Sequence, residues 1–246
     1  MNLTGGLAWH WQAWRAQARW APTVRRLEAW LHSQTNWPGA STSPTDLPAP
    51  LKAPRKLLLI GASAGWMMPN SWLRQFEEVH TFDIDPWAAP LFKWRHADAL
   101  KKSGTTLTCH TQNAFAHFPQ LLEAHPEACV FFDNVLGQIR FQTKEIDSVE
   151  TNFERIRQSL QGRQWGSVHD RMSGPVQRYF GAPPQAPEKI DTDKQTQQWL
   201  MRMNAQSPWL DHLTQHVFPA QTAVENFAWA FKPGYWHWLQ AGWVRP

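Results

Sequence analysis

A run of small residues follows the apolar segment 57–60, and it is bare enough for a ligand to lie against the backbone. Gly61 and Gly65 enclose only alanine and serine, so no large side chain blocks the main chain. The glycines can instead serve a tight strand-to-helix turn. We expect Gly61, Ala62, Ser63 and Gly65 to contact a ligand. A Walker P-loop is excluded because no Lys-Ser/Thr pair follows, and G-x-G-x-x-G is absent.

Polar side chains also follow the next three apolar runs. Asp83 stands 22 residues after Gly61, where an acidic group can accept hydrogen bonds from a ribose diol. Asn113 follows the third run, and its amide could read the edge of an adenine. Asp133 and Asn134 follow the fourth. We expect these four residues to bind a cofactor; the alternatives are that Asp83 caps the next helix and that Asn134 serves a turn.

The fifth apolar run ends in residues that can move a proton. His169 and Asp170 close the stretch WGSVHD, and a histidine can remove a proton from a hydroxyl or an amine. Both are candidate catalytic residues, with a structural role for His169 as the alternative. Arg171 and Tyr179 lie in the adjoining segment and are candidate substrate contacts.

Short strands alternate with helices from residue 55 onward, which predicts a mostly parallel sheet covered on both faces. Ligands bind such a sheet beyond the carboxyl ends of its strands, where the polar residues above stand. Two apolar-aromatic runs flank Pro233 and Gly234 and predict an antiparallel hairpin. The expected strands are 57–60, 78–85, 105–110, 128–133, 165–170, 225–232 and 235–245, and the expected helices are 69–76, 87–96, 114–124 and 145–160.

The chain divides at a proline-rich stretch, 38–54, which we expect to be a linker or a strap. A tryptophan- and arginine-rich helical extension, 1–37, precedes it, and the α/β domain, 55–246, follows. An insert, 171–224, interrupts the alternation of strands and helices. The helices expected in this insert lie around 192–204 and 208–216.

Composition indicates an ordinary globular protein with 42% hydrophobic residues and no run near the roughly 20 apolar residues of a membrane span. The N-terminus has no apolar run behind basic residues, so we expect a cytoplasmic protein. Cys109 and Cys129 are expected to be reduced and structural. His212 and His216 stand four apart, but no third ligand is placed, so no metal is expected.

The motifs at the strand ends resemble those of the class I S-adenosylmethionine-dependent methyltransferases. IGASAG stands at the glycine-rich first motif, FDID at the ribose-binding strand end, and QNA at the adenine contact. FFDNVLGQ resembles the segment that borders the methyl-donor pocket. The resemblance covers about residues 55–246. It implies a Rossmann-like doubly wound sheet with a C-terminal antiparallel hairpin, S-adenosylmethionine as cofactor, and methyl transfer to a small or medium acceptor.

Three positions depart from the pattern of that family. Leu59 stands where an acidic residue is usual, Ser63 replaces the middle glycine, and Asn113 replaces an aspartate. These departures favour an alternative interpretation, a non-catalytic member of the fold that acts as a partner subunit or adenosyl-ligand sensor.

The extension allows three interpretations. Leu7, Trp11, Trp14 and Ala18 recur at helical spacing, and Pro22 is expected to separate this helix from a second one. Together the helices could form a lid over the pocket, or pack on the sheet or on a second copy in a homodimer. Stacking of the tryptophans on nucleic-acid bases is the least favoured interpretation. No membrane partner is expected.

Overall fold

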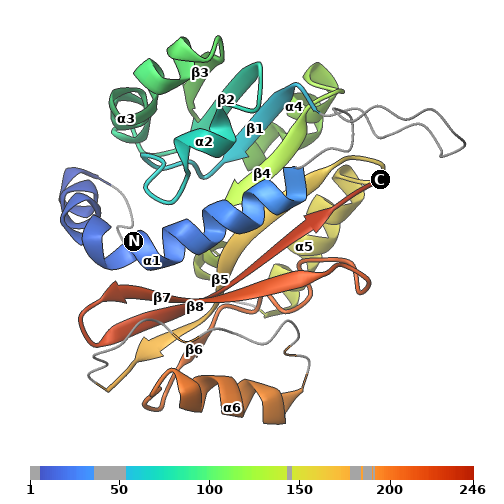
Figure 1. Ribbon diagram of the computed structural model, residues 1–246. Helices are drawn as coiled ribbons and strands as arrows, with labels where there is room; N and C mark the ends of the chain where they lie inside the picture. The colour runs from blue at the N-terminus through green and yellow to red at the C-terminus, as the bar shows by residue number, and fades with distance from the viewer. Residues whose placement is uncertain (1–5, 36–53, 143–145, 178–183, 185–189, 191) are drawn as a thin grey trace, which may run out of the picture.

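One mixed β-sheet runs through the part of the chain that the computed structural model describes, residues 6–35, 54–142, 146–177, 184, 190 and 192–246 (Figure 1). Its strand order is β3-β2-β1-β4-β5-β8-β7, and the short β6 pairs with β5 off this path. The order steps outward from β1 to β3 on one side and to β5 on the other. This reversal creates a switch point at β1 and β4, and a ligand site is expected there.

The first five strands are parallel, as the sequence predicts. Strand β4 is buried at every residue and β1 at four of its five, because helices cover both faces of the sheet. Their bounds are β1 Lys56–Ile60, β2 Glu78–Asp83, β3 Thr106–Thr111, β4 Cys129–Asp133 and β5 Trp165–Pro175.

The closing hairpin is also confirmed. Strand β7 (Val224–Lys232) pairs antiparallel with β8 (Tyr235–Val244), and Gly234 makes the turn with φ +70°. β8 lies antiparallel to β5 along its whole length, with a register shift between Asp170 and Met172. Fold class is therefore α/β, a Rossmann-like sheet that ends in an antiparallel hairpin.

Helices cover both faces of the sheet. One apolar core lies between the sheet and α1, α2 and α3, and a second lies on the face that α4 and α5 cover. A third cluster joins α6 to the outer face of the hairpin. The bounds are α2 Asn70–Leu73, α3 Ala88–Lys102, η1 Ala114–His117, α4 Phe118–Ala124, η2 Leu136–Gln142, α5 Ile146–Ser159 and α6 Asp193–Arg202.

The extension forms one continuous helix, α1 (Leu7–Thr35), so the predicted break at Pro22 is wrong. A proline removes one hydrogen bond and its ring crowds the preceding turn, but tertiary contacts outweigh this local cost. Trp20 Nε1 donates to the carbonyl of Phe231 at 2.9 Å, and Thr23 Oγ1 donates to that of Ala228 at 3.0 Å. The helix is therefore fixed to β7 on both sides of the proline, and its buried face belongs to the main core.

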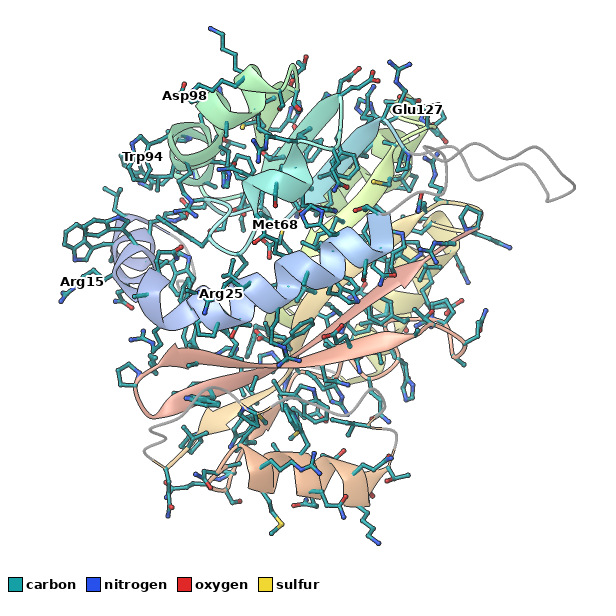
Figure 2. All side chains as sticks on the ribbon, viewed as in Figure 1. Arg15, Arg25, Met68, Trp94, Asp98 and Glu127 are labelled. Carbon is teal, nitrogen blue, oxygen red and sulfur yellow. The ribbon has the colours of Figure 1, made fainter. Side chains whose placement is uncertain are left out.

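The apolar stripe of the extension faces solvent instead of the core. Leu7, Trp11 and Trp14 are 53%, 58% and 48% exposed. The face that packs on the sheet carries His10 and Ala13 in this half of the helix, and Trp20, Leu27 and Trp30 farther along. Figure 2 shows the same side of the molecule, where the labelled Arg15 and Trp94 project outward from α1 and α3.

The second helix expected in the insert, 208–216, is absent. The segment contains only the two-residue strand β6 (Leu210–Asp211) followed by turns. Asp211 Oδ1 accepts the N–H of Leu213, which has φ +61°, so a local side-chain bond replaces the first helical turn. The proline-rich stretch 38–54 lies almost entirely outside the described residues.

Both cysteines are free, Cys129 buried and Cys109 partly buried, as expected. Among the described residues no helix has both the length and the apolar character that crossing a bilayer requires.

Candidate functional site

The glycine loop lies at the carboxyl end of β1, at the switch point of the sheet. Gly61, Ser63 and Gly65 have φ values of +74°, +47° and +64°, so three of its five residues adopt the left-handed region. The N–H of Ser63 points across to β2 and donates to Oδ2 of Asp83 at 2.7 Å. The loop and Asp83 therefore lie together at the same edge of the sheet.

Side chains of the protein itself occupy the space beside the two glycines. A Cβ on Gly61 would stand 2.5 Å from Cβ of Val135, and one on Gly65 would stand 2.3 Å from Nε2 of His96. Packing and backbone conformation therefore require glycine at both positions, whether or not a ligand also approaches. Burial lowers the pKa of His96 to about 4, so this ring packs as the neutral form.

Asp83 is partly buried and already accepts two backbone hydrogen bonds. Besides Ser63, the N–H of Asp85 donates to its Oδ1 at 2.8 Å. Burial raises the pKa of this carboxyl, and the two backbone donors counteract part of that effect. Each carboxylate oxygen retains a second lone pair, which leaves Asp83 able to accept bonds from a ligand hydroxyl.

Asp133 ends β4 on the other side of the loop and is 8% exposed. Burial, with the charge of nearby Asp83 as a second cause, raises its pKa to about 8. No hydrogen bond joins its carboxyl to another described residue, and its oxygens are not among the fully buried side-chain atoms that lack a partner, so the carboxyl can still accept a bond from a ligand. Asn134 follows with φ +53°, which turns the chain back toward β5.

Asn113 starts η1 and accepts the N–H of Phe115 through Oδ1 at 3.0 Å. Its carboxamide oxygen therefore caps a turn, while the amide nitrogen remains for a ligand. Ala62 is buried within the loop.

A second polar group lies where β4, β5 and β8 meet. Asn134 Nδ2 donates to Oδ2 of Asp170 at 3.1 Å, and the N–H of Asp170 donates to Oδ1 of Asn134 at 2.9 Å. His237, from β8, donates from Nδ1 to Oδ1 of Asp170 at 2.6 Å. Burial would raise the pKa of Asp170, but the neighbouring His237 and other polar groups outweigh it, so the pKa is lowered.

His237 is a functional candidate that the sequence analysis missed. With Nδ1 bonded to Asp170, its Nε2 is buried and has no partner among the described residues. This is the arrangement in which a carboxylate orients an imidazole and leaves the other nitrogen to accept a proton. The ring sits among Trp229, Phe231 and Tyr235, with ring centroids 5.2, 4.5 and 5.7 Å away. His237 and Asp170 are 67 residues apart in the sequence, so only the antiparallel pairing of β5 and β8 shows that they meet.

His169 lies on the opposite face of the sheet from Asp170, because neighbouring residues of a strand alternate. It is fully buried, with Nδ1 2.9 Å from Oγ of Ser167 and its ring 5.3 Å from that of Phe218. Burial lowers its pKa to about 3. The structure thus separates the predicted catalytic pair and gives His169 the surroundings of a packed, neutral residue.

Of the two predicted substrate contacts, only Arg171 lies among the described residues, and its side chain is already bonded to other residues. Arg171 donates to Asp211 Oδ1 at 2.6 Å and to Gln215 Oε1 at 2.8 Å, and its guanidinium lies 5.7 Å from the ring centre of Trp238. Tyr179 lies outside the described residues. Arg171 therefore holds the insert against the hairpin.

The first turn of α1 covers the neighbourhood of Asp83. Trp66 Nε1 donates to Nδ1 of His10 at 3.0 Å, so His10 carries its proton on Nε2 and donates to Asp85 Oδ2 at 3.1 Å. The N–H of Gly6 donates to the same carboxylate. The start of α1 is therefore fixed to the loop after β2.

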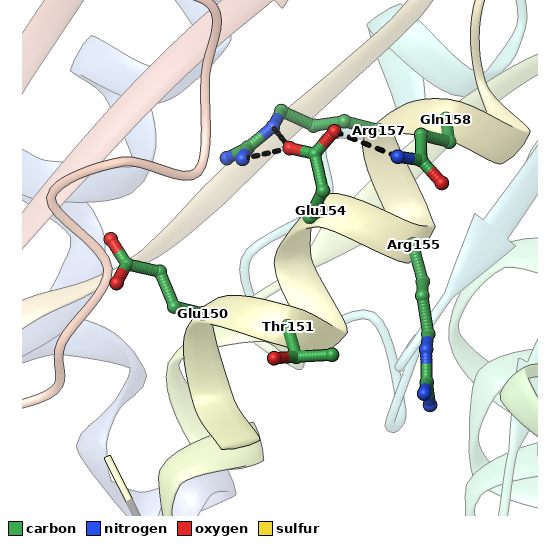
Figure 3. Close-up of a pocket in the computed structure, with 6 residues that line it drawn as sticks. All are labelled: Glu150, Thr151, Glu154, Arg155, Arg157 and Gln158. Atoms are coloured by element: carbon green, nitrogen blue, oxygen red, sulfur yellow. Dashed lines mark hydrogen bonds and ion pairs between the residues drawn. The ribbon is translucent and has the colours of Figure 1, made fainter. Parts of the chain in front are cut away.

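Two hollows of about 510 Å³ each lie elsewhere. One is lined by residues of α5 alone, with Glu154 paired to Arg157 (Figure 3). The other lies at the opposite edge of the sheet, around Arg55 and Glu127. Neither touches the glycine loop. The described residues contain no cluster of three metal-ligating side chains.

Comparison with known proteins finds likeness in fold only. No protein-family profile and no curated protein matches the sequence. Among solved structures, magnesium protoporphyrin IX methyltransferase of Synechocystis PCC 6803 with bound S-adenosylmethionine is 14% identical, with TM-score 0.45 over 98% of this chain and 86% of that one.

Two further matches illustrate the breadth of that likeness. The N-methyltransferase NodS of Bradyrhizobium japonicum WM9, with S-adenosylhomocysteine, is 11% identical at TM-score 0.41 over 78% of each chain. A Rhodobacter sphaeroides protein described as a Zn-dependent alcohol dehydrogenase is 12% identical at TM-score 0.38, over 78% of this chain and 84% of that one. Such values concern architecture, and a reaction must be argued from the residues of the site.

Proposed function

We propose that the protein is an S-adenosylmethionine-dependent methyltransferase acting on a small or medium acceptor. The observation that carries the proposal is the meeting of Asp83, the 61–65 loop and Asp133 at the switch point of a β3-β2-β1-β4-β5-β8-β7 sheet. These groups come from three adjacent strands and include one carboxyl that has no partner among the described residues. That set suits a ligand that carries hydroxyls and lies against bare backbone.

The donor would supply an electrophilic methyl group on a sulfonium. Asp83 and Asp133 would accept hydrogen bonds from its ribose hydroxyls, and Asn113 would offer its amide to the adenine. Asp133 suits this role because its carboxyl ends β4 beside the loop and makes no hydrogen bond to another described residue. The loop of Gly61, Ala62, Ser63 and Gly65, together with Asn134, would form the wall of the donor pocket.

His237 is the base in this proposal, and Asp170 is the residue that orients it. As the acceptor oxygen or nitrogen bonds to the methyl carbon, the carbon–sulfur bond of the donor would break and S-adenosylhomocysteine would leave. The proton of the acceptor would pass to Nε2 of His237, and the carboxylate of Asp170 would stabilise the resulting imidazolium. Asn134 links this pair to the end of β4, directly beside Asp133. Trp229, Phe231 and Tyr235 around the ring favour an acceptor with a flat or apolar part.

Calorimetry with S-adenosylhomocysteine tests the donor site. We expect micromolar binding by the parent and about a tenfold or greater loss in Asp83→Ala, because a ribose contact disappears. Asp83→Asn serves if the alanine variant does not fold, and Asp98→Ala, an exposed carboxylate on α3, is the matched control. A folded parent that binds neither S-adenosylmethionine nor S-adenosylhomocysteine would overturn the proposal.

The base is tested separately, once a mass gain of one methyl group has identified an acceptor among metabolite pools. We expect His237→Gln to lower kcat by about 100-fold or more while S-adenosylhomocysteine binding is retained. His169→Asn, on the other face of the same sheet, should leave kcat nearly unchanged. Equal losses in the two variants would remove His237 from its role.

A second candidate function is a non-catalytic sensor or partner subunit of the same fold. The observation that favours it is that the loop is already packed without a ligand. Val135 and His96 fill the space beside the glycines, and two backbone N–H groups donate hydrogen bonds to Asp83. Donor binding without turnover of any acceptor would support the sensor, and absence of donor binding would support the partner subunit.

A further inference from the structure

The start of α1 and helix α3 lie on the same side of the molecule (Figure 1), and each carries large apolar side chains that are exposed to solvent. On α1 these are Trp11 and Trp14, whose ring centroids lie 4.9 Å apart. At the start of α3 they are Trp87 and Trp94, 44% and 68% exposed. On each helix the exposed residues recur at helical spacing, which makes a continuous stripe.

The two stripes are joined into one surface. Gly6 and His10, in the first turn of α1, both bond Asp85, and Ile84 beside it is 71% exposed. Six of the eight large apolar side chains that are exposed in the described part of the chain belong to this surface. We call it the tryptophan face, and its members are Leu7, Trp11, Trp14, Ile84, Trp87 and Trp94.

Two exposed cations stand next to residues of the tryptophan face. Arg15 and Lys93 are neighbours of its tryptophans in sequence and form no ion pair with any residue the structure describes. Asp98 is the single exposed carboxylate on the two helices. The exposed cations of α1 and α3 are Arg15, Arg19, Arg25, Lys93, Lys101 and Lys102.

We propose that the tryptophan face docks on an anionic membrane surface. Indole rings prefer the boundary between headgroups and acyl chains, and arginine and lysine beside them attract anionic lipids. A second copy of the chain is a poorer occupant, since a two-fold contact would bring like cations together with one carboxylate on each side. The contact lies on the membrane, so it requires no spanning helix.

Cosedimentation with vesicles tests the proposal on the full chain. We expect binding to vesicles of equal phosphatidylglycerol and phosphatidylcholine, weakening with added salt, and little binding to phosphatidylcholine alone. Combined Trp11→Ser and Trp14→Ser should reduce binding about tenfold or more, and so should combined Arg15→Glu and Lys93→Glu. These side chains are exposed, so both variants should fold, which the unfolding midpoint verifies.

Met201→Ser is the matched control, because Met201 is 74% exposed on α6, away from the tryptophan face. It should bind vesicles as the parent does. Three results would overturn the proposal: no binding to anionic vesicles, equal loss in the control, or a dimer in sedimentation that Trp11→Ser and Trp14→Ser abolish. Salt-sensitive binding of RNA by the same residues, without vesicle binding, would also overturn it in favour of a nucleic-acid surface.

Discussion

The two halves of the site are built differently. On the side of β1, β2 and β4, the polar groups contact backbone: Asp83 accepts N–H bonds from Ser63 and Asp85. On the side of β5 and β8, side chains contact one another, with Asp170 between Asn134 and His237. The geometry of a loop fixes the first half, which we call the donor half after its proposed role. The pairing of distant strands fixes the second, which we call the acceptor half.

This difference has energetic consequences. The donor half depends on conformations that only small residues adopt, and it contains a buried carboxyl at some cost in stability. The acceptor half satisfies its buried charge with two side-chain partners, so it should stabilise the fold as well as serve a reaction. Substitutions confined to one half can test whether the donor half lowers the stability of the fold and whether the acceptor half raises it.

The largest effect is expected at Gly61. Gly61→Ala should lower the free energy of unfolding by about 4 kcal/mol, since its Cβ would collide with Val135 and φ is +74°. Gly104→Ala, with φ +80° and open space around it, should cost only about 1 kcal/mol. Urea unfolding measures both, and equal losses would show that backbone strain alone, without packing, requires glycine in the loop.

Asp170→Ala should lower the free energy of unfolding by about 3 kcal/mol, because it leaves the buried donors of His237 and Asn134 without an acceptor. Asp98→Ala, at an exposed site, is the comparison. Urea unfolding at neutral pH measures the difference. A loss no greater than that of the control would mean that the acceptor half contributes nothing to the fold.

Acid should destabilise the donor half through His96. Its folded pKa is about 4, below the ordinary value of 6.5, so the unfolded chain binds the proton first. The stabilisation is complete above pH about 6.5 and declines toward pH 4, by about 2 kcal/mol for this residue between 6.5 and 5. His96→Gln should flatten the pH dependence of urea unfolding, whereas exposed His117→Gln should leave its slope unchanged.

Asp133→Asn should raise stability slightly, by about 1 kcal/mol at pH 7. The folded pKa of about 8 lies above the ordinary 3.8, so the parent loses stability as pH rises from about 4 to 8, and the variant does not. Melting temperatures of both proteins across this range provide the measurement. An advantage that does not grow with pH would contradict the raised pKa of the Asp133 carboxyl.

Sequence pattern predicted the parallel strands that bring Asp83 beside the glycine loop, because the information for these strands is local. Short apolar runs with polar residues at their ends specify parallel strands, and Asp83 was placed beside the loop by its position in the strand alternation. The register of β1 with β2 and β4 then brought these ends together. The helix expected at 208–216 failed for an equally local reason, an aspartate that bonds the backbone two residues on.

The sequence by itself determined the order of strands and helices, the closing hairpin and which polar residues end the parallel strands, since burial periodicity and turn chemistry act within a few residues. Tertiary structure alone decided that His237 joins Asp170 while His169 lies on the other face, because strand pairing sets which residues meet. It also decided that α1 continues through Pro22 and presents Trp11 and Trp14 outward. Contacts with β7 selected which face of that helix to bury, and helical spacing alone could not.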